Sequence, residues 1–429
     1  MTGIVLFVTL LVFLVLNVPV GIAIGLASLA AITTNPRMTD SFIVSQLISG
    51  SDSFPLMAIP LFILAGELMA AGGVSKRILN VCNVFLGRVT GGLAIVTVVV
   101  CMFFAAVSGS GPATVAAVGS MVVPTMLEKG YSKSFTLACV ACAGCIGVII
   151  PPSIPMVIYG TSTGTSVSTM FMAGFLPGIL IGVSLCLYSS FYCKKHGYIN
   201  KDAAPFSWGN VGYALKDGVW ALLVPVIILG GIYGGIFTPT EAAAVAVAYG
   251  LVVGLFVYRD LKLKDLYRIF ASAALTTATI LIILGTATTF GRILTLERVP
   301  MLIADFFESV TDRRIVLLML INILLLIVGT FMDMTPACLI FTPIFLPICQ
   351  ALGMNTIHFG IMMIFNLCIG TITPPVGTTL FVGVKVGKTR IEQVISPLLY
   401  YFGAIFIVLM LVSYIPALSL WLPGLLGYV

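Results

Sequence analysis

Gly147-Val-Ile-Ile-Pro-Pro-Ser153 interrupts a long apolar stretch of this 429-residue chain, and Gly370-Thr-Ile-Thr-Pro-Pro-Val376 interrupts another one 223 positions later. Gly160, which follows the first Pro-Pro pair, recurs at the same offset as Gly383. Proline has no backbone N–H, and its ring collides with the preceding helical turn, so a Pro-Pro pair breaks an α-helix. The sequence therefore predicts one broken helix in each half of the chain, and the fixed offset indicates that the halves are repeats of one unit.

A second interruption precedes each broken helix. Ser108-Gly-Ser-Gly-Pro112 aligns with Gly329-Thr-Phe-Met-Asp-Met-Thr-Pro336 after a shift of one residue, and both lie between apolar runs. Glycine and proline at such points favour a tight turn, so re-entrant hairpins are predicted at 92–127 and 315–351. Paired interrupted segments in the two halves of a membrane protein point to the binding site of a secondary transporter.

The composition is typical of a membrane protein. Sixty per cent of the residues are apolar, 8% are charged, and the mean hydropathy is +1.18. Soluble domains average roughly 25% charged residues, and no polar linker divides this chain, so we expect one integral membrane domain. The first 16 residues lack a basic segment and a convincing cleavage site, and we therefore expect a retained helix rather than a signal peptide.

The predicted fold class is an all-α polytopic membrane protein with two inverted-topology repeats, each holding a re-entrant hairpin and a broken transmembrane helix. Besides the hairpins, helices are expected at 3–16, 18–34, 54–75, 134–160 (broken), 169–193, 218–236, 240–258, 267–292, 356–384 (broken) and 396–420. Segment 3–16 is short for a full crossing of ~20 residues. Either it is a separate helix or it continues into the next one across Asn17-Val-Pro19.

Basic residues predict which loops face the cytoplasm. Five loops are rich in lysine and arginine, around Arg88, Lys133, Lys194, Lys264 and Lys388. In contrast, Glu297–Arg314 balances three basic with four acidic residues, and both Thr161–Ser168 and the tail after Trp421 are uncharged. This alternation predicts periplasmic N- and C-termini. It also puts the connectors 76–88 and 297–314 on opposite membrane faces, as inverted repeats require.

Polar backbone is exposed at the two hairpin turns and the two helix breaks. In lipid such backbone survives only when buried in protein or lining a wet cavity, so we expect each turn to meet the break of its own half. The resulting cages of carbonyl and hydroxyl oxygens suit a small hard monovalent cation, Na⁺. Sodium site 1 is predicted at Ser108, Gly109, Ser110, Gly111 and Gly147, and sodium site 2 at Gly329, Thr330, Asp333, Thr335, Gly370 and Thr373.

Asp333 is an acidic residue inside the second predicted hairpin. A carboxylate at this depth is costly and by default marks an ion or proton path. The alternative is a structural role, in which Asp333 caps the helix that begins at Met334.

The helix fragments after the breaks begin with free amides, and a helix start attracts anions. This arrangement suits a carboxylate substrate. The expected substrate-binding residues are Ser110, Pro151, Ser153, Thr335, Thr378 and Thr379. For Ser153 a capping role is the alternative, and for Arg292 two roles stay open, binding a substrate carboxylate or reaching from a helix end to the membrane interface.

The other acidic residues in the apolar helices are interpreted as structural. Glu241 lies in the first turn of a helix after Thr238 or Thr240, where the helix dipole favours a negative charge. Glu67 is expected either to bond to a neighbouring helix or to pair with a basic group of a partner subunit.

Enzyme signatures are missing from the sequence. The two histidines, His196 and His358, have no nucleophile nearby in sequence, and no phosphate-binding loop occurs. Cys139, Cys142 and Cys145 share a helix face, but packing of small thiols is the preferred interpretation over a metal site. We therefore expect a protein that is not an enzyme, with no organic cofactor and no nucleic-acid partner.

Six motifs in order resemble a known family over nearly the whole chain. They are Asn17-Val-Pro-Val-Gly21, Pro60-Leu-Phe-Ile-Leu-Ala-Gly66, Ser108-Gly-Ser-Gly-Pro-Ala113, Pro151-Pro-Ser153, Gly235-Ile-Phe-Thr-Pro-Thr-Glu-Ala-Ala-Ala244 and Thr373-Pro-Pro-Val-Gly377. Together they resemble the large membrane (permease) subunit of tripartite ATP-independent periplasmic (TRAP) transporters.

This resemblance implies sodium-driven import of an organic acid, of the sialic acid or C4-dicarboxylate class, across the bacterial inner membrane. It implies an elevator mechanism of the ion-transporter-superfamily type, in which a transport body moves against a scaffold. The transport body comprises residues 92–160 and 315–384, and the scaffold and arm segments comprise 1–91 and 161–314. The C-terminal helix covers 385–429. It also implies two partners besides the lipid bilayer, a small four-helix membrane subunit and a periplasmic substrate-binding protein.

Three other functions are alternatives to a TRAP permease. A stand-alone sodium/dicarboxylate symporter without a binding protein is the nearest alternative. A channel would need a continuous polar pore, whereas the polar backbone here is concentrated at two closed turns. A purely structural partner has no use for costly breaks and an intramembrane Asp333.

Overall fold

The computed structural model describes residues 2–35, 38–198, 207–310 and 313–428, and these residues form helices without a β-strand. Eight helical segments among them are long and apolar enough to cross a membrane. They are Phe54–Ala71, Val167–His196, Trp208–Tyr233, Pro239–Val257, Leu263–Leu296, Arg314–Phe331, Met334–Ala351 and Ile395–Tyr414. The predicted all-α class is confirmed. The expected connector 297–314 includes residues 311–312, which lie outside the described residues.

The chain begins with α1 (Thr2–Val15), α2 (Val20–Thr33) and α3 (Asp40–Ser51). The first two are separate helices, because the chain turns at Asn17 with φ of 60° and α2 starts directly after Pro19. Segment 3–16 is therefore a separate helix and does not continue into the next one across Asn17-Val-Pro19. Helix α3 was not predicted, since its mixture of polar and apolar residues has no strong period.

The two hairpins and the two broken helices lie where the sequence predicts them. Hairpin 1 consists of α6 (Gly92–Ser108) and α7 (Gly111–Glu128), and hairpin 2 of α15 (Arg314–Phe331) and α16 (Met334–Ala351). The first broken helix consists of α8 (Lys133–Cys145), η2 (Ile146–Val148) and α9 (Ile154–Thr163), and the second of α17 (Thr356–Gly370) and α18 (Thr378–Val386). Both Pro-Pro pairs fall in the non-helical gaps, and each pair is joined by a cis peptide bond.

The remaining helices surround these elements. They are η1 (Phe54–Met57), α4 (Ala58–Ala71), α5 (Val74–Leu86), α10 (Val167–His196), α11 (Trp208–Tyr233), α12 (Pro239–Val252) with the π-helix η3 (Val253–Val257), α13 (Leu263–Leu296), α14 (Val299–Val310), η4 (Ile391–Gln393), α19 (Ile395–Tyr414) and α20 (Ala417–Leu425). The last predicted helix, 396–420, is in fact two helices, because the chain leaves the helical conformation at Ile415 just before Pro416.

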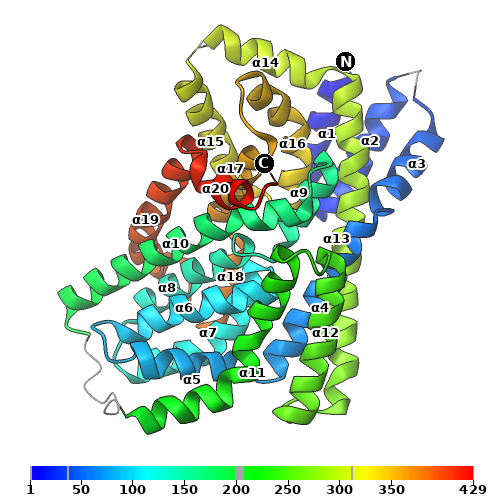
Figure 1. Cartoon of the computed structure of the whole chain (residues 1–429). Helices are drawn as coiled ribbons and strands as arrows, with labels where there is room; N and C mark the ends of the chain where they lie inside the picture. The colour runs from blue at the N-terminus through cyan, green and yellow to red at the C-terminus, as the bar shows by residue number, and fades with distance from the viewer. Residues whose placement is uncertain (1, 36–37, 199–206, 311–312, 429) are drawn as a thin grey trace.

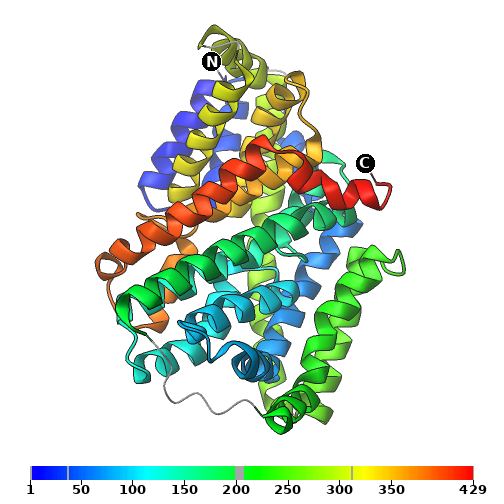
Figure 2. The ribbon, with the colours of Figure 1, turned by 60° about the vertical axis from the view of Figure 1, so that its left-hand side comes forward.

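Helix α13 has 34 residues and runs along one side of the molecule, where it packs against α2, α3, α4 and α16 (Figure 1). Helix α4 packs against both α12 and α13. The connectors α5 and α14 lie at opposite ends of the molecule, as both views show (Figures 1 and 2). The hairpins and broken helices lie beside this outer group of helices.

The second fragment of each broken helix crosses into the other half of the chain. Helix α18 packs against α7 and α8, and α9 packs against α16. Hydrogen bonds fix these crossings, because Lys133 Nζ donates to Lys388 O at 3.1 Å and Tyr159 OH donates to Thr356 O at 2.7 Å. Each half therefore completes the packing of the other.

Arg77 fastens the connector α5 to its neighbours. Its guanidinium lies 3.5 Å from Asp217 of α11 and 2.5 Å from Asp260, and it stacks over the ring of Tyr258 at 3.7 Å from the centroid. Tyr258 OH in turn donates to Asp217 O at 3.0 Å. The planar guanidinium is suited to pairing and stacking at the same time.

We expect Arg77→Ala to loosen α5 and to lower the free energy of unfolding by about 1–2 kcal/mol, because two half-exposed carboxylates lose their partner. The measurement is the thermal unfolding midpoint of the purified protein in detergent. Lys76→Ala, which removes an exposed neighbouring charge, is the matched control. Equal midpoints for the two variants would contradict the role of Arg77 in holding α5 against its neighbours.

Candidate functional site

The tip of hairpin 1 is a tight turn between two helix ends. Helix α6 ends at Ser108, Gly109 adopts φ of 61°, and α7 starts at Gly111. The Ser110 hydroxyl caps α7 by accepting from the N–H of Ala113 at 3.5 Å. Only glycine takes the conformation of residue 109 without strain.

This tip lies against the break of the same half. The N–H of Ile154 donates to Gly109 O at 3.3 Å. A methyl group on Gly147 would lie 2.8 Å from Ser110 O and 2.6 Å from Thr114 Oγ1, so only glycine fits there. The structure thus brings Ser108, Ser110 and Gly147 together, as the sequence predicts for these positions.

Thr114 joins this cluster and was not predicted. Its hydroxyl donates to Ser110 O at 2.8 Å and lies 3.0 Å from Ser108 Oγ. The residue sits one turn inside α7, where the apolar pattern gives no signal. The cluster offers hydroxyl and carbonyl oxygens without a charged group, a ligand set that suits a hard monovalent cation better than a transition metal.

The tip of hairpin 2 meets its own break in the same way. The N–H of Val376 donates to Thr330 O at 3.2 Å. A methyl group on Gly370 would lie 2.5 Å from the Cα and 2.6 Å from the O of Gly329, so the two backbones are in direct contact. The Thr373 hydroxyl donates to Ile369 O at 2.8 Å, and that of Thr330 to Ile327 O at 2.7 Å.

Asp333 occupies the N-cap position of α16, and its carboxyl lies near the backbone N–H groups of Met334 and Thr335, although no capping hydrogen bond of regular geometry forms. Oδ1 also accepts from the Thr378 hydroxyl at 3.4 Å, which links the hairpin tip to the start of α18. Thr335 is buried in the first turn of α16. The second cluster therefore differs from the first by carrying one carboxylate.

The two clusters adjoin each other across the halves. Thr379 Oγ1 would lie 3.0 Å from a methyl group on Gly111, and it donates to Thr371 Oγ1 at 3.0 Å. Cys368 Sγ donates to the carbonyl of Cys145 at 3.0 Å, and these two cysteines are themselves 223 positions apart. The breaks of both halves thus meet in the interior.

The other predicted substrate-binding residues lie nearby. Ser153 is fully buried, donates to Val148 O at 2.6 Å and accepts from the N–H of Met156 at 3.4 Å, so it caps α9. Pro151 is buried in the break beside it. Arg292 is exposed near the end of α13. A role of these residues in substrate binding stays a prediction.

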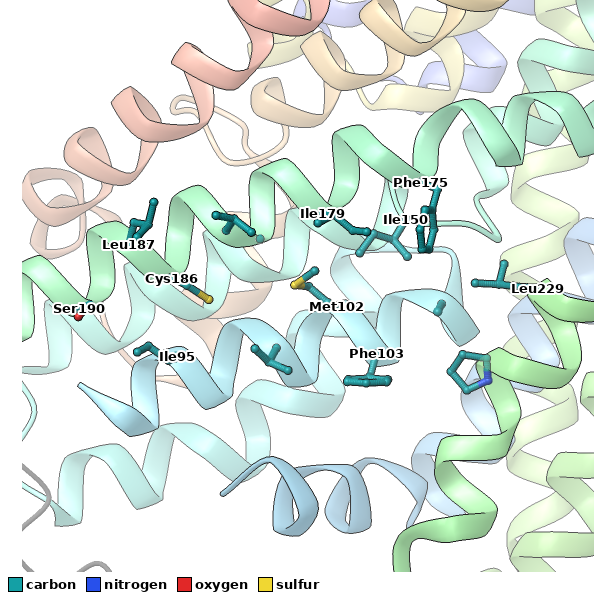
Figure 3. Close-up of a pocket in the computed structure, with 15 residues that line it drawn as sticks. Ile95, Met102, Phe103, Ile150, Phe175, Ile179, Cys186, Leu187, Ser190 and Leu229 are labelled. Atoms are coloured by element: carbon teal, nitrogen blue, oxygen red, sulfur yellow. The ribbon is translucent and has the colours of Figure 1, made fainter. Parts of the chain in front are cut away.

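The cavities differ in what they can hold. One of about 590 Å³ lies between α6, α10 and α11, and Figure 3 shows side chains such as Met102, Ile179 and Leu229 pointing into it. Its lining is almost wholly apolar, which does not suit an organic acid. Another cavity, of about 530 Å³, lies between α4, α13 and the tip of hairpin 1, and Ser108, Ser110 and Glu67 line it. Its size and mixed lining are typical of a small-molecule site.

The residues interpreted as structural have structural contacts. Glu241 and Thr238 form a capping box, in which Glu241 Oε2 accepts from the Thr238 N–H at 2.8 Å. The segment Cys139–Cys145 is buried throughout, and no cluster of three potential metal-ligating side chains occurs in the described part of the chain. His358 is buried, with Nε2 2.8 Å from Val412 O.

Comparison with known proteins decides the family. The family model described as "Tripartite ATP-independent periplasmic transporter, DctM component" matches residues 7–418. The chain belongs to this family. As a DctM component it is a multi-pass membrane protein of a transporter, and the resemblance read from the six motifs is confirmed.

Relatives of this DctM component are named for different substrates. The chain is 47% identical over 420 residues to the isethionate TRAP transporter permease protein DctMQ of Oleidesulfovibrio alaskensis, and covers 98% of itself and 66% of that protein. It is 39% identical to the C4-dicarboxylate TRAP transporter large permease protein DctM of Vibrio cholerae, covering 98% of itself and 97% of that protein. This chain therefore spans about two thirds of the length of the first relative.

Solved structures show the same fold at low identity. The YdaH transporter of Alcanivorax borkumensis superposes with a TM-score of 0.58 at 14% identity, covering 90% of this chain and 89% of that one. At this identity the likeness concerns the fold alone.

Proposed function

We propose that this DctM component imports a small organic acid by sodium-coupled secondary transport. The observation that carries this proposal is the pair of oxygen clusters at the hairpin tips, of which the second includes the intramembrane carboxylate of Asp333. Carbonyl and hydroxyl oxygens beside broken helices are the ligands that hold Na⁺ in secondary transporters. Ser108, Ser110, Thr114 and the backbone at Gly147 would hold one ion, and Asp333 with the backbone at Gly329, Thr330 and Gly370 would hold the other.

The proposed mechanism is an elevator built from two inverted repeats. The order of connector, hairpin, broken helix and long helix in α5–α10 recurs in α14–α19. The connectors α5 and α14 lie at opposite ends of the molecule (Figure 1), which supports repeats of opposite topology. In this proposal residues 92–160 and 315–384 form the moving body, and α5 and α14 brace it.

The proposed setting is the bacterial inner membrane, with both termini in the periplasm. The family description supports two partners, a small membrane subunit and a periplasmic binding protein. The relatives' names support an acid of low molecular weight, since they specify isethionate in one case and C4-dicarboxylates in the other.

The test is uptake of labelled acids into proteoliposomes that contain this chain and its small subunit. Isethionate, succinate and sialic acid are offered with and without an inward sodium gradient, and with and without the cognate binding protein. We expect uptake only when both are supplied. Uptake that needs sodium but no binding protein would identify a stand-alone symporter, and uptake indifferent to sodium would overturn the proposal.

Removing single oxygens from the first cluster should weaken sodium binding. For Ser108→Ala, Ser110→Ala and Thr114→Val we expect the sodium concentration at half-maximal uptake to rise about fivefold each, since one hydrogen-bond-like contact is worth about 1 kcal/mol. Ser120→Ala is the control, because Ser120 is exposed on α7 and bonds only within its own helix. An unchanged sodium titration in all three variants would remove this cluster from the coupling mechanism.

A further inference from the structure

We propose that Glu67 contacts the end of the substrate that does not carry the substrate's acidic group. This permease would then take small monoanions with a hydroxyl or ammonium at that end rather than dicarboxylates. The inference rests on the proposed function and narrows its substrate class. It starts from the cavity of about 530 Å³ between α4, α13 and hairpin 1.

Glu67 and the tip of hairpin 1 line the same cavity. The polar side chains of its lining are Glu67, Ser108, Ser110 and Thr276, and the rest are glycine, proline, alanine and larger apolar residues. Helix α4 is in direct contact with the tip of hairpin 1, because a methyl group on Gly66 would lie 3.0 Å from the Cα of Ser108. Glu67 is therefore the residue that follows the point of contact between α4 and the hairpin.

The carboxylate of Glu67 can accept further hydrogen bonds from a ligand. Its one polar partner among the described residues is Ser272, whose hydroxyl donates to Oε1 at 2.9 Å. No basic side chain in those residues pairs with it. An ionised carboxylate only accepts hydrogen bonds, and its two oxygens have about four lone-pair sites. A ligand that donates a hydrogen bond would satisfy part of this capacity.

The part of the lining that comes from hairpin 1 favours an anion. Ser110 caps the 18-residue helix α7, and Pro112 and Ala113 of its first turn line the cavity. Ser108 and Ser110 of the same hairpin also line the cavity. Amide dipoles at a helix start stabilise a carboxylate or sulfonate, so the lining combines a helix start that favours an anion with the carboxylate of Glu67.

A second carboxylate on the substrate would face Glu67. Two like charges at close range in a medium of reduced dielectric repel each other strongly, whereas a hydroxyl or ammonium would donate to the same oxygen. Specificity of this kind arises from the penalty on the wrong ligand as much as from the contact to the right one.

The experiment measures binding to the purified complex of this chain and its small subunit in saturating sodium, without the binding protein, so that only the permease discriminates. The probes are two matched pairs, 4-hydroxybutyrate against succinate and isethionate against sulfoacetate. We expect the wild type to bind the hydroxylated member of each pair at least about tenfold more tightly. In Glu67→Gln, which keeps the size and removes the charge, this preference should vanish.

Two variants serve as controls. Glu67→Asp keeps the charge and should keep the preference, and Glu392→Gln removes an exposed acid that does not line the cavity and should behave as wild type. Co-purification of the small subunit is measured for every variant.

Several results would overturn the inference. The inference is wrong if the wild type binds dicarboxylates as tightly as hydroxy acids. It is also wrong if the wild type binds no hydroxy acid. Unchanged preference in Glu67→Gln would overturn it too. Loss of the small subunit from Glu67→Gln alone would make Glu67 an interface residue. In each of these cases sodium-driven uptake of some other acid would leave the proposed function standing.

Discussion

Asp333→Asn is expected to reduce sodium-driven uptake by about a thousandfold while the protein folds normally. The change removes a negative charge from the second cluster, and at an effective dielectric of about 20 a charge at 4 Å from a cation is worth about 4 kcal/mol. Uptake into proteoliposomes over a range of sodium concentrations measures the effect. Size-exclusion profile and helix content report on folding.

The asparagine variant separates the two roles of this residue. Asn caps a helix about as well as Asp, so a residue that only caps α16 would tolerate the change. The side chain lies near the amides of Met334 and Thr335 and also accepts from Thr378, so the capping role has to be tested directly. Asp305→Asn, at an exposed position on α14, controls for the loss of one negative charge. Wild-type sodium dependence in Asp333→Asn would remove this residue from the coupling site.

Gly370→Ala should destabilise the protein and separate hairpin 2 from its break. The added methyl group would lie 2.5 Å from the Cα of Gly329, which is backbone and has no rotamer to change. Overpacking of this kind costs about 1–3 kcal/mol or more. We expect a lower yield, a lower unfolding midpoint and loss of sodium-induced thermal stabilisation.

Gly403→Ala is the matched control for this prediction. It places the same methyl group inside helix α19, where no atom lies within 4 Å. Alanine is a better helix former than glycine by about 1 kcal/mol, so this variant should be neutral or more stable. If Gly370→Ala matched it in stability and sodium response, the close approach of Gly329 and Gly370 would be wrong.

The sequence was sufficient to predict the hairpins and breaks because their signals are local. Proline pairs and glycine-rich turns interrupt otherwise apolar helices at Ser108–Pro112 and at Pro374-Pro375, and no tertiary information is needed to see this. The oxygen atoms at the turns that we propose as sodium ligands followed from the same local reasoning.

What the sequence could not predict depends on contacts between distant segments. Thr114 lies inside a regular helix, and its proximity to Ser110 is visible only once α7 is built. Nothing in the pattern around Glu67 indicates that its neighbour Gly66 touches Ser108. Similarly, Thr379 was expected from its place after the second break, but its position against Gly111 of the first half results from the crossing of α18.

That crossing has a consequence for how the protein is made. Helices α7 and α8 leave the ribosome early, yet the surface that they present to α18 stays uncovered until residues 378–386 have been synthesised and inserted. Maturation in the membrane must therefore be completed late, after nearly the whole chain has left the translocon. Chains terminated before α18 would expose this surface to lipid and to quality-control proteases, so shortened products should be degraded rather than accumulate.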